Sequence, residues 1–415
     1  MQLEKFSMGI GDRFYHQGAA QLQGIISYST DHVKVSPVWN KSYREHQIVG
    51  TKPESVLKEA QQAVEFHDFK NSYYIDADHI GLDTVDDFIE YSNYFTLDVV
   101  DYIGGEVPLE ERNEFVDDFQ DYISKTNLPG NLEEEDYNEN KLNNIVDKYL
   151  PAVKQADKIY KYIKNTKETE KFITEVSMDE TDSPQTPEEL FLILFALAKK
   201  EVPVQVIAPK FSGEFLKGID YVGDVDQFQQ EVKNDIQIIS FMTDKFDLPD
   251  NLKLSMHSGS DKYSIYPKIK EILKETDSGF HLKTAGTTWL EELHGLILSQ
   301  GEGLKFVKDL YKEALRRIDE LAGPYQEVID IDRSKLPSKQ EIETISAPEL
   351  SRMLVNDPEE EKYNSNLRQL FHISYKLAAE AGDEFFNLLE NNKETISEQV
   401  EQNIYRHLDN LFPNN

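Results

Sequence analysis

Short apolar runs and amphipathic stretches alternate along residues 1–302 of the chain. Each apolar run has the length of a β-strand, and most are followed by a segment whose apolar positions recur at helical spacing. The predicted strands cover residues 5–11, 35–39, 72–80, 94–104, 171–180, 204–211, 251–259 and 279–286. The predicted helices cover residues 18–29, 52–67, 84–93, 186–201, 224–246, 266–276 and 287–300.

This alternation indicates parallel β-strands that are joined by helical crossovers. Eight such units with short, right-handed connections fit most simply into a closed (β/α)8 barrel of the TIM type. A doubly wound open sheet is the alternative arrangement. We therefore predict an α/β protein in which residues 1–302 form the barrel.

Two regions depart from the alternation. Residues 105–168 are polar and acidic with helical stretches, which predicts a helical insertion between the fourth and fifth strands. Its function is left open, with a solvated helical excursion as the simplest interpretation. Residues 303–415 show amphipathic helical patterns and no convincing strand. We expect them to form a C-terminal helical extension that packs on the barrel.

Composition narrows the classes of partner. Asp and Glu outnumber Lys and Arg by 77 to 44, and the formal net charge of −33 argues against nucleic acid. There is no cysteine, so any metal must be held by histidine, carboxylate or carbonyl groups. The longest apolar run, at 190–198, is too short to cross a membrane, and the N-terminus lacks a signal-peptide pattern. We expect a cytoplasmic protein with a small-molecule partner, and the oligomeric state is left open.

The active site of a (β/α)8 barrel lies at the C-terminal ends of its strands. Almost every predicted strand brings a charged residue to this rim. The residues at or just after the strand ends include Asp12, Arg13, His16, Asp76, Asp78, His79, Asp98, Asp101, Glu175, Asp179, Lys210, Glu214, His257, Asp261, Lys262, His281 and Lys283.

Three of these residues are candidate metal ligands. His79, His257 and His281 fall at the ends of the third, seventh and eighth predicted strands. Imidazole suits zinc, manganese, iron, cobalt or nickel, and three protein ligands leave positions open for a substrate. A hydrogen-bonded core histidine is the alternative for each one taken singly. Because side chains alternate along a strand, His79 faces the same side as Asp78 only if the strand has already ended, and we assume that it has.

Acidic and basic residues at the rim supply candidates for proton transfer and substrate binding. Asp78 adjoins a proposed ligand and is a candidate base, although it could equally be a structural carboxylate. Glu214 lies in a loop between Gly213 and Gly218 that could close over a substrate, and an exposed loop acid is the competing interpretation.

Lysines at the rim have two interpretations. Lys210, Lys262 and Lys283 are candidate cationic partners for an anionic substrate, and a lysine at a strand end can also form a Schiff base. The segments "GIGDRF" and "SGSDK" lack the spacing of a P-loop or dinucleotide fingerprint, so no nucleotide is expected.

Several long motifs carry a resemblance to a known family. They are "KFSMGIGDRFYHQGAAQLQ", "YIDADHIGLDTVDDFI", "FTLDVVDYIG", "APKFSGEFLKGIDYVGD", "KLSMHSGSDKYSIYP" and "FHLKTAGTTWLEEL". Together they resemble the tagaturonate epimerase family of hexuronate catabolism. The resemblance runs through the whole predicted barrel and is weakest over the acidic insertion and the C-terminal helices.

The resemblance implies a divalent-metal-dependent interconversion of D-tagaturonate and D-fructuronate. Carried onto this chain, it implies Asp78 as proton acceptor and Glu214 as proton donor. It implies His79, His257 and His281 as metal ligands, with His294 as the alternative to His281. Cations at the rim would then hold the substrate carboxylate; the candidates are Arg13, Lys210, Lys262 and Lys283.

The chemistry of this reaction favours retro-aldol cleavage. The two ketohexuronates differ at a hydroxyl-bearing carbon β to the ketone, whose hydrogen simple enolisation cannot remove. Cleavage, rotation of the aldehyde half and re-addition would invert it. Two alternatives are a Schiff-base aldolase that uses Lys210 or Lys283, and a sugar-acid binding protein without catalysis.

Overall fold

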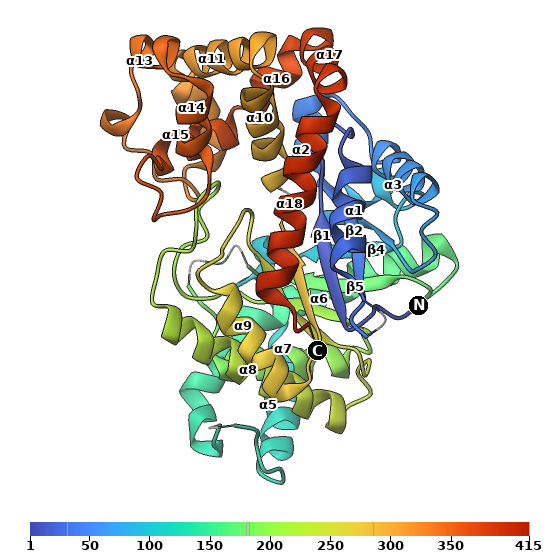
Figure 1. Ribbon diagram of the computed structural model, residues 1–415. Helices are drawn as coiled ribbons and strands as arrows, with labels where there is room; N and C mark the ends of the chain where they lie inside the picture. The colour runs from blue at the N-terminus through green and yellow to red at the C-terminus, as the bar shows by residue number, and fades with distance from the viewer. Residues whose placement is uncertain (31, 131, 180, 182, 285, 415) are drawn as a thin grey trace.

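The computed structural model describes residues 1–30, 32–130, 132–179, 181, 183–284 and 286–414. Within these residues eight parallel strands close into a barrel, each next to its neighbours in the chain (Figure 1). The strands are β1 (Phe6–Ile10), β2 (Val35–Ser42), β3 (Tyr74–Ile80), β4 (Tyr94–Asp98), β5 (Ile173–Ser177), β6 (Val206–Ala208), β7 (Lys253–His257) and β8 (Phe280–Lys283). The predicted (β/α)8 barrel is confirmed, and the open sheet is excluded.

The barrel closes where β1 pairs with β8. Phe6 is in register with Phe280, and Gly9 is in register with Lys283. A Cβ atom at Gly9 would lie 3.0 Å from Cγ of Lys283, so glycine is what allows the lysine side chain to pass across β1. The closure therefore brings Lys283 toward the barrel mouth.

Several predicted elements are shorter in the structure. The strand predicted at 94–104 ends at Asp98 and gives way to the 3-10 turn η1 (Val100–Tyr102). The helix predicted at 84–93 is reduced to α4 (Val85–Phe88). An additional helix, α2 (Tyr43–Val49), begins directly after β2 because Ser42 and Glu45 form a capping box.

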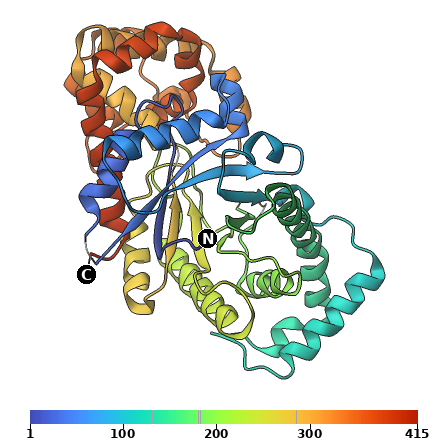
Figure 2. The ribbon, with the colours of Figure 1, turned by 90° about the vertical axis from the view of Figure 1, so that its right-hand side faces the viewer.

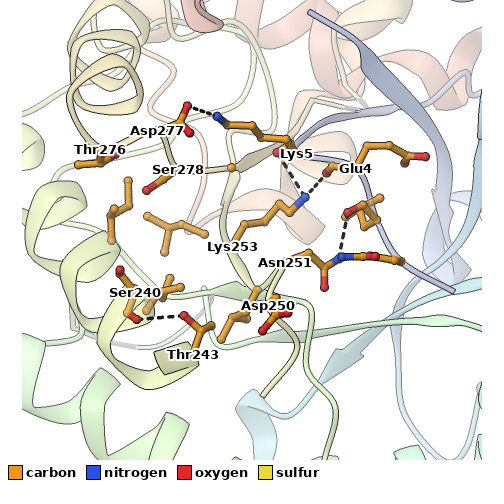
Figure 3. Close-up of a pocket in the computed structure, with 17 residues that line it drawn as sticks. Glu4, Lys5, Ser240, Thr243, Asp250, Asn251, Lys253, Thr276, Asp277 and Ser278 are labelled. Carbon is orange, nitrogen blue, oxygen red and sulfur yellow. Dashed lines mark hydrogen bonds and ion pairs between the residues drawn. The ribbon is translucent and has the colours of Figure 1, made fainter. Parts of the chain in front are cut away.

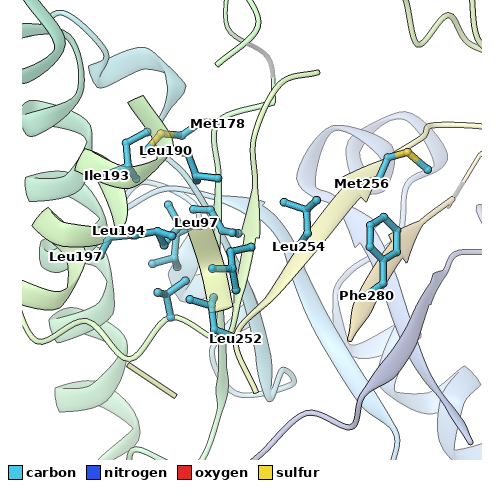
Figure 4. Packing of buried hydrophobic residues seen from close by; sticks show 14 of the residues in the cluster. Leu97, Met178, Leu190, Ile193, Leu194, Leu197, Leu252, Leu254, Met256 and Phe280 are labelled. Carbon is cyan, nitrogen blue, oxygen red and sulfur yellow. The ribbon is translucent and has the colours of Figure 1, made fainter. Parts of the chain in front are cut away.

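Most crossover helices lie where the apolar periodicity predicts them. They are α1 (Gly18–Tyr28), α3 (Glu54–Phe66), α7 (Pro187–Lys199), α8 (Val225–Lys245) and α9 (Tyr266–Thr276). Helix α7 begins at a capping box formed by Thr186 and Glu189 and buries Leu190 and Leu194. Figure 4 shows these leucines in one apolar cluster with Leu97 of β4, the packing that fixes the strands beneath the helices.

The region 105–168 is helical, as predicted. It contains α5 (Leu109–Ile123), the 3-10 turn η2 (Glu134–Tyr137) and α6 (Glu139–Lys167). Helix α6 contributes Tyr149, Val153 and other residues to the core that also holds the strands, so part of this region serves as the crossover between β4 and β5. Figures 1 and 2 both place α5 and its surroundings far from the C-terminal helices.

The C-terminal helices form a second apolar core, and two helices link it to the barrel core. Helix α10 (Thr287–Ser299) follows β8, yet its Trp289 and Leu293 pack with the C-terminal helices. Helix α18 (Lys393–Leu411) spans both cores: Ile396 and Val400 pack with the C-terminal helices, and Ile404 and Leu408 join the main core. Figure 1 shows α18 running alongside α1. Residue 302 therefore does not separate the two cores.

The remaining helices complete the C-terminal helical part of the chain. They are α11 (Gly301–Arg316), α12 (Ile318–Ala322), η3 (Gly323–Tyr325), η4 (Arg333–Lys335), α13 (Lys339–Thr344), α14 (Ala347–Leu354), α15 (Ser365–Ile373), α16 (Tyr375–Ala381) and α17 (Asp383–Asn391). None of the helices in the described ranges has the length and apolar character needed to span a bilayer.

Candidate active site

A cavity of about 620 Å³ opens at the C-terminal ends of the strands. Five of the predicted site residues line it: Arg13, Asp78, His79, His257 and Lys283. Two residues from the C-terminal helical part, Tyr325 and His372, complete its wall. The cavity therefore lies where a barrel of this kind carries its active site.

Two histidines and one aspartate in this cavity form a candidate metal centre. One potential ligand atom from each of His79, Asp179 and His257 lies within 4.8 Å of the others. The two imidazole rings are 5.1 Å apart between centroids and nearly perpendicular. Imidazole nitrogens with one carboxylate oxygen suit a divalent transition metal and leave coordination positions open.

The backbone at His79 explains how it joins Asp78 at the cavity. We assumed that the third strand ends before this residue, but β3 continues to Ile80. His79 instead has φ of +53°, and the pairing with β4 shifts register between Ala77 and Ile80. This irregularity breaks the alternation of the strand, so consecutive side chains both line the cavity. A left-handed conformation in a non-glycine residue costs about 1–3 kcal/mol and is common at functional sites.

Carboxylates hold both imidazole rings in place. Nε2 of His257 is 2.7 Å from Oε1 of Glu175, and its Nδ1 is 3.1 Å from Oδ2 of Asp179. Nδ1 of His79 is 3.4 Å from Oδ2 of Asp98. Carboxylates that bind the second nitrogen of a ligating histidine orient the ring toward its metal.

The site attracts positive charge. Burial disfavours the His79 imidazolium, but Asp78, Asp98 and Asp179 outweigh this and raise the pKa of His79 to about 10. For His257, burial is likewise outweighed by Asp179 and Glu175, and its pKa rises to about 9. The carboxylates thus stabilise the protonated rings of His79 and His257, and they would equally stabilise a metal cation bound between these rings.

Asp78 is paired with a buried lysine. Nζ of Lys283 lies 2.6 Å from Oδ1 of Asp78, 2.8 Å from Oδ2 of Asp76 and 2.7 Å from Oγ1 of Thr96. Burial alone would raise the pKa of Asp78, but Lys283 and His79 hold it below its ordinary value. Burial, together with the charges of Asp78 and Glu175, raises the pKa of Asp76. Asp78 is therefore an ionised carboxylate that faces the cavity.

The structure does not bring His281 to the metal centre. His281 is two residues before Lys283 on β8, which places its side chain one layer deeper in the barrel. Its Nδ1 is 2.9 Å from Oγ of Ser7, and burial lowers its pKa to about 3. Asp179, rather than His281, lies with His79 and His257 in the candidate metal centre. The alternative, His294, lies on α10 and contacts Ser351.

Glu214 and two of the predicted lysines also lie apart from the cavity lining. Glu214 is exposed and pairs through its backbone with Val222. The Lys210 ammonium donates to the Thr181 carbonyl oxygen. The Lys262 ammonium is fully buried and donates to carbonyl oxygens of the β6–α8 loop, including that of Ile219 at 2.8 Å. In this conformation these residues stabilise loops of the rim.

Asp179, Asp98 and Glu175 are the site residues that the selection of ligands from the sequence missed. All three stand at predicted strand ends, and their position was the available signal. The preference for three histidines passed over them. Carboxylates and histidines both stand at the strand ends, and their spacing along the chain does not show which of them would bind a metal.

A second cavity, of about 650 Å³, lies at the opposite end of the barrel (Figure 3). The Lys253 ammonium there donates to the carbonyl oxygens of Glu4 and Lys5, and Lys5 pairs with Asp277. The N-terminal face of such barrels contributes stability rather than catalysis. The cavity beside the histidines is therefore the candidate active site.

A closed (β/α)8 barrel with imidazoles, carboxylates and an ion-paired aspartate at its strand ends defines a barrel enzyme with the features of a metal site. A family model described as tagaturonate epimerase (UxaE) matches residues 1–411. The chain belongs to the tagaturonate epimerase family, and it is therefore an enzyme of the isomerase class.

Individual relatives agree with this assignment. The chain is 29% identical over 419 residues to a tagaturonate/fructuronate epimerase of Thermotoga maritima, a match that covers 98% of this chain and 80% of the relative. A glycerol-complexed crystal structure of fructuronate-tagaturonate epimerase from Cohnella laeviribosi superposes with a TM-score of 0.80 at 25% identity. That match covers 99% of this chain and 82% of the crystallised one. The native crystal structure of the same enzyme gives a TM-score of 0.78.

Proposed function

We propose that the chain interconverts D-tagaturonate and D-fructuronate with the help of a divalent cation held by His79, Asp179 and His257. The observation that carries the proposal is the convergence of these three ligands beside the ionised Asp78, in a chain of the tagaturonate epimerase family.

The donor set fits a divalent metal. It combines two imidazoles with one carboxylate, and Glu175 and Asp98 orient the rings from behind. Zinc, manganese, nickel, cobalt and iron all accept such ligands. When bound, the cation would act as a Lewis acid that polarises the substrate ketone and stabilises the negative charge that develops on its oxygen.

Asp78 is the residue we assign to proton transfer. In a retro-aldol step, its carboxylate takes the proton of the hydroxyl β to the ketone while the adjacent carbon–carbon bond breaks. Re-addition to the opposite face of the aldehyde returns the proton from Asp78 to the same oxygen. One carboxylate therefore serves both directions, and Lys283 keeps it ionised between turnovers.

Glu214 remains the proposed donor of the alternative scheme with two acid–base residues. Its exposed position on the loop with Val222 requires that this loop move toward the cavity before Glu214 reaches a substrate. Cleavage and re-addition through Asp78 alone need no such movement. We therefore favour the scheme in which Asp78 is the single acid–base residue.

The Schiff-base alternative fits the geometry less well. A lysine must be neutral to attack a ketone. Burial opposes the charge on Lys283, but Asp76 and Asp78 outweigh it and raise the pKa of the ammonium above its ordinary value. The Lys210 ammonium is bound to the Thr181 carbonyl oxygen outside the cavity.

The decisive experiment is incubation of metal-loaded enzyme with D-tagaturonate, with the product identified by NMR. We expect D-fructuronate to form and its formation to stop on chelation. Absence of conversion with each of several divalent metals would contradict the proposal. An adduct trapped by borohydride on Lys283 or Lys210 would replace it with the Schiff-base mechanism.

A further inference from the structure

The C-terminal helical part contributes a histidine to the cavity wall. His372 of α15 lines the cavity and is 1% exposed. Its Nε2 lies 3.3 Å from Nη2 of Arg13, which follows β1. The Arg13 guanidinium also donates from Nε to Glu45 at 2.9 Å and stacks on the Tyr375 ring at 4.1 Å. Arg13 is thus fixed between the barrel and α15–α16.

This pair carries unused hydrogen-bond donors. Burial and the charges of Arg13 and Lys217 hold the pKa of His372 well below its ordinary value, so its ring is neutral. Since Nε2 faces the guanidinium donor, Nδ1 carries the ring proton. Within the described residues, Nδ1 of His372 and Nη1 of Arg13 are both buried without a hydrogen-bond partner. Buried donors without acceptors are rare, and each needs an explanation.

Glycines in the rim loops allow His372 and Lys217 to pack closely beside the cavity. A Cβ atom at Gly286 would lie 2.5 Å from Cε1 of His372 and 2.3 Å from the carbonyl oxygen of Gly259. A Cβ atom at Gly259 would lie 2.9 Å from Nζ of Lys217. The loops after β6, β7 and β8 therefore approach α15 at positions where a side chain does not fit. Lys217, Gly259 and Gly286 line the same cavity.

We infer that Arg13 and His372 together form the subsite that binds the substrate carboxylate, so that the C-terminal helical part selects sugar acids over neutral ketoses. A carboxylate accepts from both unused donors and from a guanidinium that its neighbours already hold in place. Lys217 adds positive charge at the same wall. The acidic residues Asp78, Asp98 and Asp179 line the same cavity from β3, β4 and the loop after β5, where they favour a cation instead.

This inference rests on the proposed function and adds a role to it. In the retro-aldol step the electrons of the broken carbon–carbon bond remain on the half with the ketone, and the hydroxyl proton passes to Asp78. The other half is an aldehyde that carries the carboxylate. An anchor at Arg13 and His372 retains this half while its aldehyde group turns, so that re-addition to the opposite face competes with escape.

The test uses variants of His372 in the full chain. His372→Asn retains a side-chain amide donor, and His372→Leu removes hydrogen bonding at similar volume. For His372→Leu we expect the KM for D-tagaturonate to rise about ten- to hundredfold, as loss of a hydrogen bond to a charged group predicts, while kcat and metal content change much less. His372→Asn should recover part of the affinity. His67→Leu, just after α3 and outside the cavity, removes a histidine that contacts a backbone carbonyl oxygen; it is the matched control and should leave KM unchanged.

Binding without turnover separates this inference from the proposed function. Calorimetry with D-galactonate and neutral galactitol should show preference for the acid in the wild type and loss of that preference in His372→Leu. Unchanged preference in a folded His372→Leu protein would overturn the inference, and so would an equal loss in His67→Leu. If the wild type does not convert D-tagaturonate, the proposed function fails, and the galactonate measurement still decides whether this wall binds carboxylates.

Discussion

Nε2 of His257 lies 2.7 Å from Oε1 of Glu175, a carboxylate that is completely buried below the barrel mouth. The other oxygen of Glu175 accepts from the Tyr94 hydroxyl at 2.5 Å and from Oγ1 of Thr96 at 3.3 Å. Thr96 in turn contacts Asp76 and Lys283. A continuous buried network thus joins the proposed metal ligand His257 to the lysine that pairs with Asp78.

Glu175→Gln should weaken metal binding. The amide can retain the contact with Tyr94 but removes the negative charge that orients His257. Loss of such a partner typically costs about 10- to 100-fold in metal affinity. Titration of the metal-free protein with zinc or manganese measures this loss, and Glu4→Gln, at the other end of the barrel, controls for the loss of one negative charge. Wild-type metal affinity in the Glu175→Gln protein would show that Glu175 does not support metal binding through His257.

The third metal ligand can be decided by comparing two substitutions. Asp179→Asn should lower metal content and activity together, because the amide is a poor substitute for the carboxylate donor. His281→Gln should retain metal, since His281 contacts Ser7 one layer below the ligands. Its expected effect is a loss of about 1–3 kcal/mol in the free energy of unfolding, because a buried hydrogen bond is disturbed.

His257→Ala completes this set. It should remove the metal and the activity while the circular dichroism spectrum of the folded barrel persists. Metal analysis of the three purified variants reads out the result. Retention of metal in Asp179→Asn with loss in His281→Gln would restore the ligand set predicted from the sequence.

A comparison of two substitutions also distinguishes the proposed acid–base roles of Asp78 and Glu214. Asp78→Asn should lower kcat by about 100- to 10,000-fold, the usual contribution of a general base, and the bound metal should remain. Glu214→Gln should lower kcat by much less, because Glu214 is exposed on its loop. Steady-state kinetics at saturating metal make the comparison. Equal losses in the two variants would show that the Glu214 loop closes over the substrate.

The buried Lys262 predicts a pH-dependent stability. Burial, opposed by Asp261 and Asp220, lowers the pKa of Lys262 to about 7, whereas an unfolded lysine titrates near about 10.4. Between these values the unfolded chain binds more protons, so the free energy of unfolding rises with pH. Compared with Lys262→Met, the wild type should gain up to about 1.4 kcal/mol per pH unit above about pH 7.

Urea denaturation of both proteins between about pH 6 and pH 9 measures this difference. Below the folded pKa both states hold the proton, and the difference should be constant. A constant difference over the whole range would mean that the carbonyl oxygens around Lys262 keep it charged.

The sequence predicts the barrel well because strand and helix periodicities are local properties. The apolar run at 251–259 and the helical pattern after it correspond to β7 and α9. The same reasoning places Asp78, His79 and His257 at the cavity, because barrel topology alone brings strand ends together.

The sequence does not predict how deep a side chain lies in the barrel. It also does not predict contacts between segments that are distant in the chain. His281 and His257 both stand at predicted strand ends, yet a difference of one layer separates a core histidine from a proposed ligand. The positive φ of His79 is a tertiary effect that strand alternation cannot foresee. His372 joins the cavity only because α15 packs against the loops of the rim, a contact between segments more than eighty residues apart.

The packing of α18 against the barrel has a consequence for biosynthesis. Gly24 of α1 allows Ile404 of α18 to approach so closely that a Cβ atom would lie 2.8 Å from it. All eight strands leave the ribosome before residues 393–411 do, so the nascent barrel exposes the apolar groove beside α1 until α18 has been translated. Chaperones that bind exposed apolar surface would meet this protein in that interval, with β1 and β8 already made and their helical cover still in the exit tunnel.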